Sequence, residues 1–207
     1  WIQPLCIDID QFSFSERSLK DEESIQLLSV ARFVEKKGLE YAIRAVAKLT
    51  ESYDITYRIA GDGERRAHLE SLINELGVSD SVQILGWRSQ SEVVKLMQNS
   101  HVFVLPSVTA KSGDKEGTPT VLLEAQSRGL PVVSTYHAGI PEIVEDGISG
   151  ILVSERDSEE LYAALERLAS NPEMWADMGH AGRENVSQKH SIEAVSGQLI
   201  DLYKSLI

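Results

Sequence analysis

The sequence predicts a doubly wound α/β domain, in which one parallel six-stranded sheet is covered by helices on both faces. Six short apolar runs of strand length occur along the 207 residues, and segments with helical spacing of apolar residues separate most of them. Strands that alternate with helices pair in parallel through right-handed crossovers. A composition of 42% hydrophobic and 25% charged residues is that of a domain able to bury a core.

The elements follow in a regular order. The predicted strands are residues 25–30, 55–60, 82–85, 102–105, 132–134 and 150–153. The predicted helices are residues 39–49, 64–76, 91–97, 120–128 and 158–168, where apolar side chains recur every three or four positions. We therefore divide the chain into a leading segment at 1–24, the α/β domain at 25–170 and C-terminal helices at 171–207.

The C-terminal segment contains two helical patterns with no strand between them. Its last part has an apolar stripe at helical spacing, made of Ile192, Val195, Leu199, Leu202 and Leu206. Such a stripe needs a partner surface. We expect these helices to pack on the domain or to return toward a further lobe outside this chain.

Charge and cysteine content exclude several classes of function. The 20 basic and 32 acidic residues give a net charge of −12, which argues against binding nucleic acid or anionic membranes. No apolar run approaches the roughly 20 residues that span a bilayer. The single Cys6 cannot form an internal disulfide, and no signal-peptide pattern opens the chain. These observations predict a cytoplasmic protein.

Two loops are expected to face one crevice. In the strand order typical of six-stranded doubly wound sheets, the first and fourth strands are neighbours, and ligands bind beyond their carboxyl ends. The loop after the fourth strand, 106–117, is longer than usual for such a connection. The loop after the first strand contains Arg32 and Lys37, two cations that suit a diphosphate. The alternative is a solvated basic turn.

Residues 116–125 give a sharper signal. Pro119 favours a helix start, so the free N–H groups of Thr120 and Val121 should point into the crevice and attract phosphate. Glu124 lies within an apolar run, where a carboxylate is costly to bury without hydrogen bonds. Hydroxyls of a ligand would supply them. The alternatives are a partly exposed helix position or a bond to nearby backbone.

Five motifs in this order resemble the donor-binding, C-terminal lobe of the group 1 (family 4) retaining glycosyltransferases, which have the GT-B fold. They are VARFVEKKG at 30–38, AGDG at 60–63, EGTPTVLLEA at 116–125, GLPVV at 129–133 and GIPE at 139–142. The resemblance covers nearly the whole chain and implies that 25–170 is a Rossmann-like nucleotide-sugar-binding domain. The Thr-Pro pair in the third motif and YHAG at 136–139 are similar to enzymes of bacterial polysaccharide assembly.

The resemblance implies a role for each charged residue of these motifs. Arg32 and Lys37 would hold the donor diphosphate and balance the charge on the departing nucleotide, which is electrostatic catalysis. Glu116 would accept hydrogen bonds from sugar hydroxyls, and Glu124 would bind the ribose hydroxyls. With two cations on the phosphates, we expect neither a metal ion nor a cofactor.

The main chain of the third motif would also contact the donor. Backbone groups around Gly117 and Thr118 would approach the sugar, and those of Thr120 and Val121 the phosphates. Many family members have Gly-Phe-Gly after the first glutamate, whereas Thr118 and Pro119 follow Gly117 here. Pro119 removes one N–H that could have contacted the donor.

Three further positions have two interpretations each. Trp87, after the third strand, either lies near the base or is a packing residue. His137 either faces the acceptor or forms local hydrogen bonds in its turn. The glycines at 61 and 63 do not follow the first strand as a dinucleotide fingerprint would, so we interpret them as a turn that a ligand approaches closely.

Together these features predict a hexosyltransferase-type domain that binds a nucleoside-diphosphate sugar. The acceptor, a carbohydrate or a lipid-linked hydroxyl, would bind an N-terminal lobe outside this chain, and the isolated domain would transfer little sugar. In full length the enzyme could be peripheral at the membrane. A noncatalytic nucleotide-sugar-binding module and a GT-B nucleotide-sugar epimerase are the alternatives.

Overall fold

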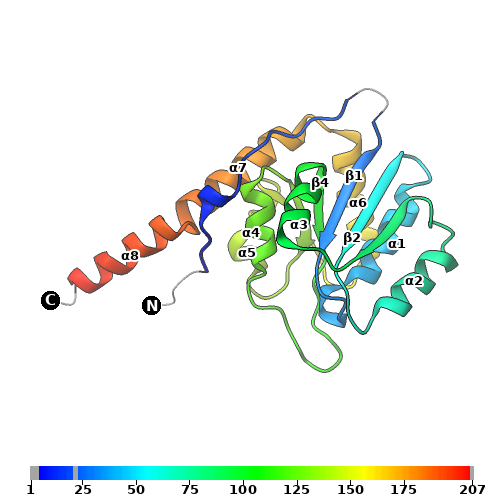
Figure 1. Ribbon diagram of the computed structural model, residues 1–207, viewed down its shortest axis with the longest axis horizontal. Helices are drawn as coiled ribbons and strands as arrows, with labels where there is room; N and C mark the ends of the chain where they lie inside the picture. Colours follow the sequence, from blue (N-terminus) through cyan, green and yellow to red (C-terminus); the bar gives the residue numbers. More distant parts are fainter. Residues whose placement is uncertain (1–4, 21–22, 206–207) are drawn as a thin grey trace.

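A computed structural model describes residues 5–20 and 23–205 and contains one six-stranded sheet (Figure 1). The strand order is β3-β2-β1-β4-β5-β6, and every neighbouring pair is parallel. The strands are β1 (Ile25–Val30), β2 (Ile55–Ala60), β3 (Val82–Gly86), β4 (Val102–Leu105), β5 (Val132–Thr135) and β6 (Gly150–Val153). The predicted doubly wound sheet is confirmed, with β1 and β4 side by side.

The helices agree with the predicted ones to within two residues at each end. They are α1 (Leu39–Leu49), α2 (Arg66–Glu75), α3 (Gln90–Gln98), α4 (Thr120–Ser127), α5 (Ile140–Ile143), α6 (Ser158–Ser170), α7 (Met174–Lys189) and α8 (Ile192–Ser205). Two short 3₁₀ turns, η1 (Ile9–Gln11) and η2 (Glu35–Lys37), complete the list. The four-residue α5 was not predicted, because a single turn shows no helical periodicity.

Alternate strand residues point into two apolar cores, one on each face of the sheet. Leu27 packs in a cluster that includes residues of α1, α2 and α6, and Leu28 packs in one that includes residues of α3, α4 and α5. Both side chains are almost completely buried. Strands covered on both faces have largely apolar sequences, which is why short apolar runs identified them.

The C-terminal helices behave differently from each other. α7 packs closely on the domain, and a side chain at Gly179 would lie 2.4 Å from the carbonyl oxygen of Gly129. α8 extends away from the sheet (Figure 1). Of its predicted stripe, Val195 is buried, Ile192 is 44% exposed, and Leu199 and Leu202 are half-buried. Leu206 lies outside the described residues.

Candidate functional site

A cavity of about 340 Å³ opens at the carboxyl ends of the central strands. It brings together residues that follow β1, β2 and β3 with residues of α3 and α4. Four predicted site residues line it: Arg32, Trp87, Val121 and Glu124. The sequence places these residues up to 92 positions apart, and the strand order joins them at one edge of the sheet.

The residues at the mouth of the cavity are open to solvent. Trp87 directly follows β3 and is 72% exposed, so it does not serve as a core residue. Arg32, two positions beyond the end of β1, is also exposed, and no carboxylate among the described residues forms an ion pair with it. A free guanidinium and an indole face therefore border the same cavity, and both can contact a planar or anionic ligand.

Glu124 contributes a carboxylate from α4 to the opposite side of the cavity. Burial raises the pKa of Glu124, while a hydrogen bond from Gln90 and the charge of Arg128 act in the opposite direction. The side chain is half-buried, and the hydrogen bond and the nearby positive charge offset part of the cost of burying its carboxylate. It retains oxygen atoms that can accept hydrogen bonds from ligand hydroxyls.

Beside the cavity, Lys37 of η2 forms an ion pair with Glu116 of the loop before α4. Lys36 lies 3.6 Å from the other carboxylate oxygen of Glu116. The Lys37 and Glu116 side chains are only 13% and 9% exposed. Burial lowers the pKa of Lys37 to about 8, and repulsion from Lys36 and Arg32 acts in the same direction. The two lysines thus share one partly buried carboxylate.

Direct main-chain contacts hold these two loops together. The N–H of Val108 donates to the carbonyl of Lys36 at 2.8 Å, and the N–H of Lys111 donates to the Glu35 carboxylate at 3.1 Å. Gly38 has φ +62°, and a Cβ there would lie 1.8 Å from the carbonyl oxygen of Pro106. Only glycine therefore fits at this crossing.

The start of α4 agrees with the prediction. Pro119 caps the helix with its carbonyl, which accepts from the N–H of Leu122 at 3.0 Å, and no side chain caps this end. The N–H groups of Thr120 and Val121 are thus free of intrahelical partners. Thr118 lies against the next motif, because a Cβ on Gly139 would lie 2.6 Å from its hydroxyl.

The glycines after β2 pack closely against the loop after β1. A Cβ on Gly61 would lie 1.8 Å from the carbonyl of Ala31, and one on Gly63 would lie 2.7 Å from that of Phe33. These glycines let the β2 loop pack on the chain's own β1 loop, which is fixed further by the Phe33 N–H to Asp62 hydrogen bond of 2.8 Å. Gly61 also lines the cavity.

His137 is buried, and its side-chain hydrogen bonds go to other loops and not to its own turn. Its ring is 1% exposed and hydrogen-bonded on both nitrogens, to the main chain of Glu116 and to the carboxylate of Glu155. Sequence reasoning singled out neither Glu155 nor Lys36. The available signals were the position of Lys36 beside Lys37 and that of Glu155 two residues after the end of β6.

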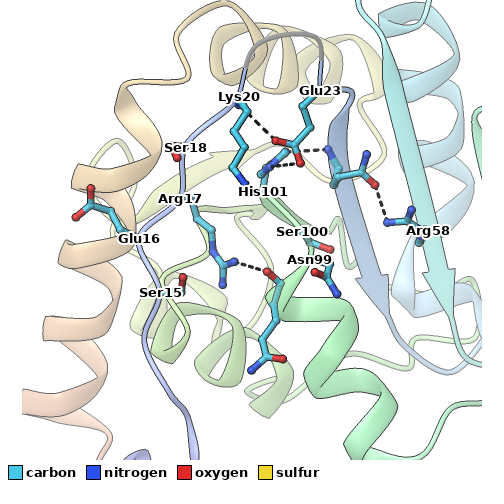
Figure 2. A pocket seen from close by; sticks show the side chains of 12 residues that line it. Ser15, Glu16, Arg17, Ser18, Lys20, Glu23, Arg58, Asn99, Ser100 and His101 are labelled. Atoms are coloured by element: carbon cyan, nitrogen blue, oxygen red, sulfur yellow. Dashed lines mark hydrogen bonds and ion pairs between the residues drawn. The ribbon is translucent and has the colours of Figure 1, made fainter.

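A second cavity, of about 380 Å³, lies at the opposite edge of the sheet, beside the amino ends of β1 and β4 (Figure 2). Its buried Arg17 is committed to two carbonyls, of Gln98 at 2.8 Å and Arg128 at 2.9 Å. Glu23 in turn bonds the Lys20 main chain. Because Arg17 holds the leading segment against the domain through these bonds, we do not place the functional site in this second cavity.

Within residues 5–20 and 23–205, no group of three or more His, Cys, Asp or Glu side chains is arranged to hold a metal ion. None of the helices in the same ranges is long and apolar enough to cross a membrane.

The sequence model of the family described as "Glycosyl transferases group 1" matches residues 10–185, which is most of the chain. This chain belongs to the group 1 glycosyl transferases. The predicted resemblance is thereby confirmed. The putative colanic acid biosynthesis glycosyltransferase WcaL of Salmonella typhimurium is 37% identical over 201 residues, covering 96% of this chain and 50% of the relative. The chain thus spans about half the length of the curated relatives it matches.

Solved structures of this family share the fold. The C-terminal domain of the group 1 protein LpcC from Francisella tularensis superposes with a TM-score of 0.76 at 21% identity, over 90% of this chain and 99% of that one. Anabaena HepE, solved in complex with UDP, gives 0.82 at 22% identity, over 97% of this chain and 56% of HepE. The group 1 chain therefore has the fold of a C-terminal GT-B lobe.

Proposed function

We propose that this chain is the donor-binding domain of a retaining glycosyltransferase, which transfers a sugar from a nucleoside-diphosphate sugar to a hydroxyl acceptor. The observation that carries the proposal is that Arg32 lines the cavity, while Lys37, close enough to feel the charge of Arg32, forms an ion pair with Glu116. Cations for a diphosphate and a carboxylate for a sugar thus lie side by side. The family match and the colanic acid relative support a role in polysaccharide or glycoconjugate biosynthesis.

The cations act on the leaving group. Arg32 and Lys37 bind the diphosphate, with the free N–H groups at the start of α4 beside them. As the bond between sugar and phosphate breaks, negative charge grows on the departing nucleotide, and the two fixed cations stabilise it. Arginine and lysine supply the positive charge that a metal ion supplies in other transferases.

The rest of the donor fits the cavity and its borders. Glu124 accepts from the ribose hydroxyls, and the exposed Trp87 contacts the base. A cavity of about 340 Å³ is within the usual size range of small-molecule sites. Glu116 accepts from the sugar hydroxyls, with the Gly117 and Thr118 main chain beside the sugar. HepE, a structural neighbour, has been solved with UDP and with UDP-glucose.

The acceptor, a carbohydrate or a lipid-linked hydroxyl, binds a lobe outside this chain, since the chain covers about half of its relatives. The isolated domain therefore binds donor but transfers little. In the full-length enzyme, the product distinguishes three functions. A new bond with the donor's anomeric configuration supports retention, an epimerised nucleotide sugar supports an epimerase, and an unchanged donor supports a noncatalytic module.

Calorimetric titration of this chain with UDP-glucose, GDP-mannose and ADP-glucose tests donor binding. Arg32→Ala is expected to weaken binding of the preferred donor at least tenfold, because a hydrogen bond to a charged group contributes about 1.5–3 kcal/mol. The matched control is Arg44→Ala, an exposed arginine on α1. Binding of none of the three donors, or binding unaffected by Arg32→Ala, would refute the donor site.

A further inference from the structure

A chain of hydrogen bonds runs behind Glu116, on the side away from its carboxylate. The N–H of Glu116 donates to Nε2 of His137 at 3.0 Å. Nδ1 of His137 lies 2.6 Å from the Glu155 carboxylate, whose other oxygen accepts from the N–H of Thr109 at 2.7 Å. Thr109 and Glu116 belong to the same long loop between β4 and α4. The His137–Glu155 pair thus holds that loop at two points.

The partners of the imidazole assign its proton. A main-chain N–H can only donate, so the Nε2 atom that faces Glu116 must be an unprotonated acceptor. The ring proton is therefore on Nδ1 and is donated to the Glu155 carboxylate. The ring is neutral in this arrangement, and with an exposure of 1% it has little access to water.

Backbone strain coincides with this pair. Two residues other than glycine have a positive φ in the part of the chain that the structure describes: Ala138 at 45° and Arg156 at 64°. Each directly follows one member of the His137–Glu155 pair. Such conformations are costly for residues with a Cβ and persist where the surroundings require a particular geometry. Both strained residues thus adjoin the pair that contacts the Glu116 loop.

The ion pair on the other side of Glu116 does not provide lasting support. Its carboxylate contacts Lys37, which the proposed function gives to the donor diphosphate. When the donor takes Lys37, the carboxylate of Glu116 keeps only the longer contact of 3.6 Å with Lys36. The bond from the Glu116 N–H to His137 does not involve Lys37, so donor binding need not break it.

We infer that His137, oriented by Glu155, is a positioning residue that fixes the Glu116 main chain so that its carboxylate meets the donor sugar. This inference rests on the proposed function for the role of Glu116. It assigns to His137 and Glu155 an effect on recognition of the sugar and none on recognition of the nucleotide.

Paired titrations test the inference, using UDP with UDP-glucose and GDP with GDP-mannose. His137→Leu is expected to lower the affinity for the nucleotide sugar about tenfold, the effect of losing one well-placed hydrogen bond, and to change that for the bare nucleotide less than about twofold. His137→Gln, whose amide oxygen can accept from the Glu116 N–H, is expected to recover most of the loss. An equal fold-loss of affinity for the nucleotide sugar and the bare nucleotide, or no loss for either ligand, would overturn the inference.

A matched control is His180→Leu. His180 forms a similar pair with Glu16 at 3.1 Å, but its side chain is exposed on α7 and does not line the cavity. This variant is expected to change neither affinity. Thermal melting of every variant separates loss of the fold from loss of positioning.

NMR on the ligand-free chain tests the same inference without a donor, and so separates its failure from that of the proposed function. The ring ¹⁵N shifts of His137 are expected to show a protonated Nδ1 and an unprotonated Nε2. Amide exchange at Glu116 is expected to be at least about tenfold faster in His137→Leu than in the unsubstituted chain. A proton on Nε2, or equal exchange in both proteins, would overturn the inference even if donors bind.

Discussion

Donor affinity is expected to fall as the pH rises through 8, because Lys37 then loses its charge. Burial lowers the pKa of Lys37 to about 8, with repulsion from Lys36 and Arg32 in the same direction. Only the protonated ammonium attracts a diphosphate. The favourable form is therefore present below pH 8 and lost above it, and a bound diphosphate raises the pKa by favouring the charged form.

The magnitude follows from that pKa. A group with a pKa of about 8 is about nine-tenths protonated at pH 7 and about one-tenth at pH 9. The diphosphate of a nucleotide sugar keeps its charge over this range. If the bound lysine stays protonated, the affinity falls about tenfold from pH 7 to pH 9, which corresponds to about 1.4 kcal/mol.

Calorimetric titration at pH 7, 8 and 9, in buffers of equal ionic strength, measures this change. Lys37→Arg keeps its charge across the range and is expected to bind with nearly constant affinity. Lys37→Met is expected to bind weakly at every pH. A flat profile for the unsubstituted chain, or the same slope in Lys37→Arg, would refute the reasoning.

Three further outcomes are expected. Glu124→Leu should weaken binding of a ribonucleotide about tenfold and remove the preference over its 2′-deoxy analogue, as measured by calorimetry; a preference that survives would contradict the ribose contact. Trp87→Leu should weaken nucleotide binding by about 1–3 kcal/mol and abolish most of the tryptophan fluorescence change on binding. Unchanged affinity and an unchanged fluorescence response would show that the base lies elsewhere. Gly38→Ala should lower the free energy of unfolding in urea by several kcal/mol, since its Cβ would overlap the Pro106 carbonyl. The control Gly77→Ala also has a positive φ but open space, and should cost about 1–2 kcal/mol; equal losses would show that the Pro106 contact is unimportant.

The arrangement of strands could be predicted because the central strands β1 and β4 are largely buried on both faces. Residues 102–105 form an unbroken apolar run, and residues 25–30 are apolar except for Gln26 and Ser29. The alternation with helices then predicted a parallel sheet with these two strands at its centre. Helix ends were less certain, since end residues such as Gln98 and Ser170 have no periodic neighbours beyond them.

The site could be predicted in part. Arg32 and Lys37 stood out as two cations in the loop after the first strand, and Glu124 as a carboxylate within an apolar run. The role of Glu116 came from the family resemblance alone. Glu155 did not stand out, because its role depends on a contact with a histidine 18 positions away in another loop. Local sequence patterns do not encode such pairings, and only the packed loops bring them together.

The crossing of Gly38 under Pro106 restricts how this domain can move. Loops that share main-chain hydrogen bonds and fit without room for a methyl group cannot slide past each other separately. The η2 turn and the loop before α4 therefore form one rigid body with the sheet edge beneath them. We therefore expect any ligand that displaces one of these loops to displace the other with it.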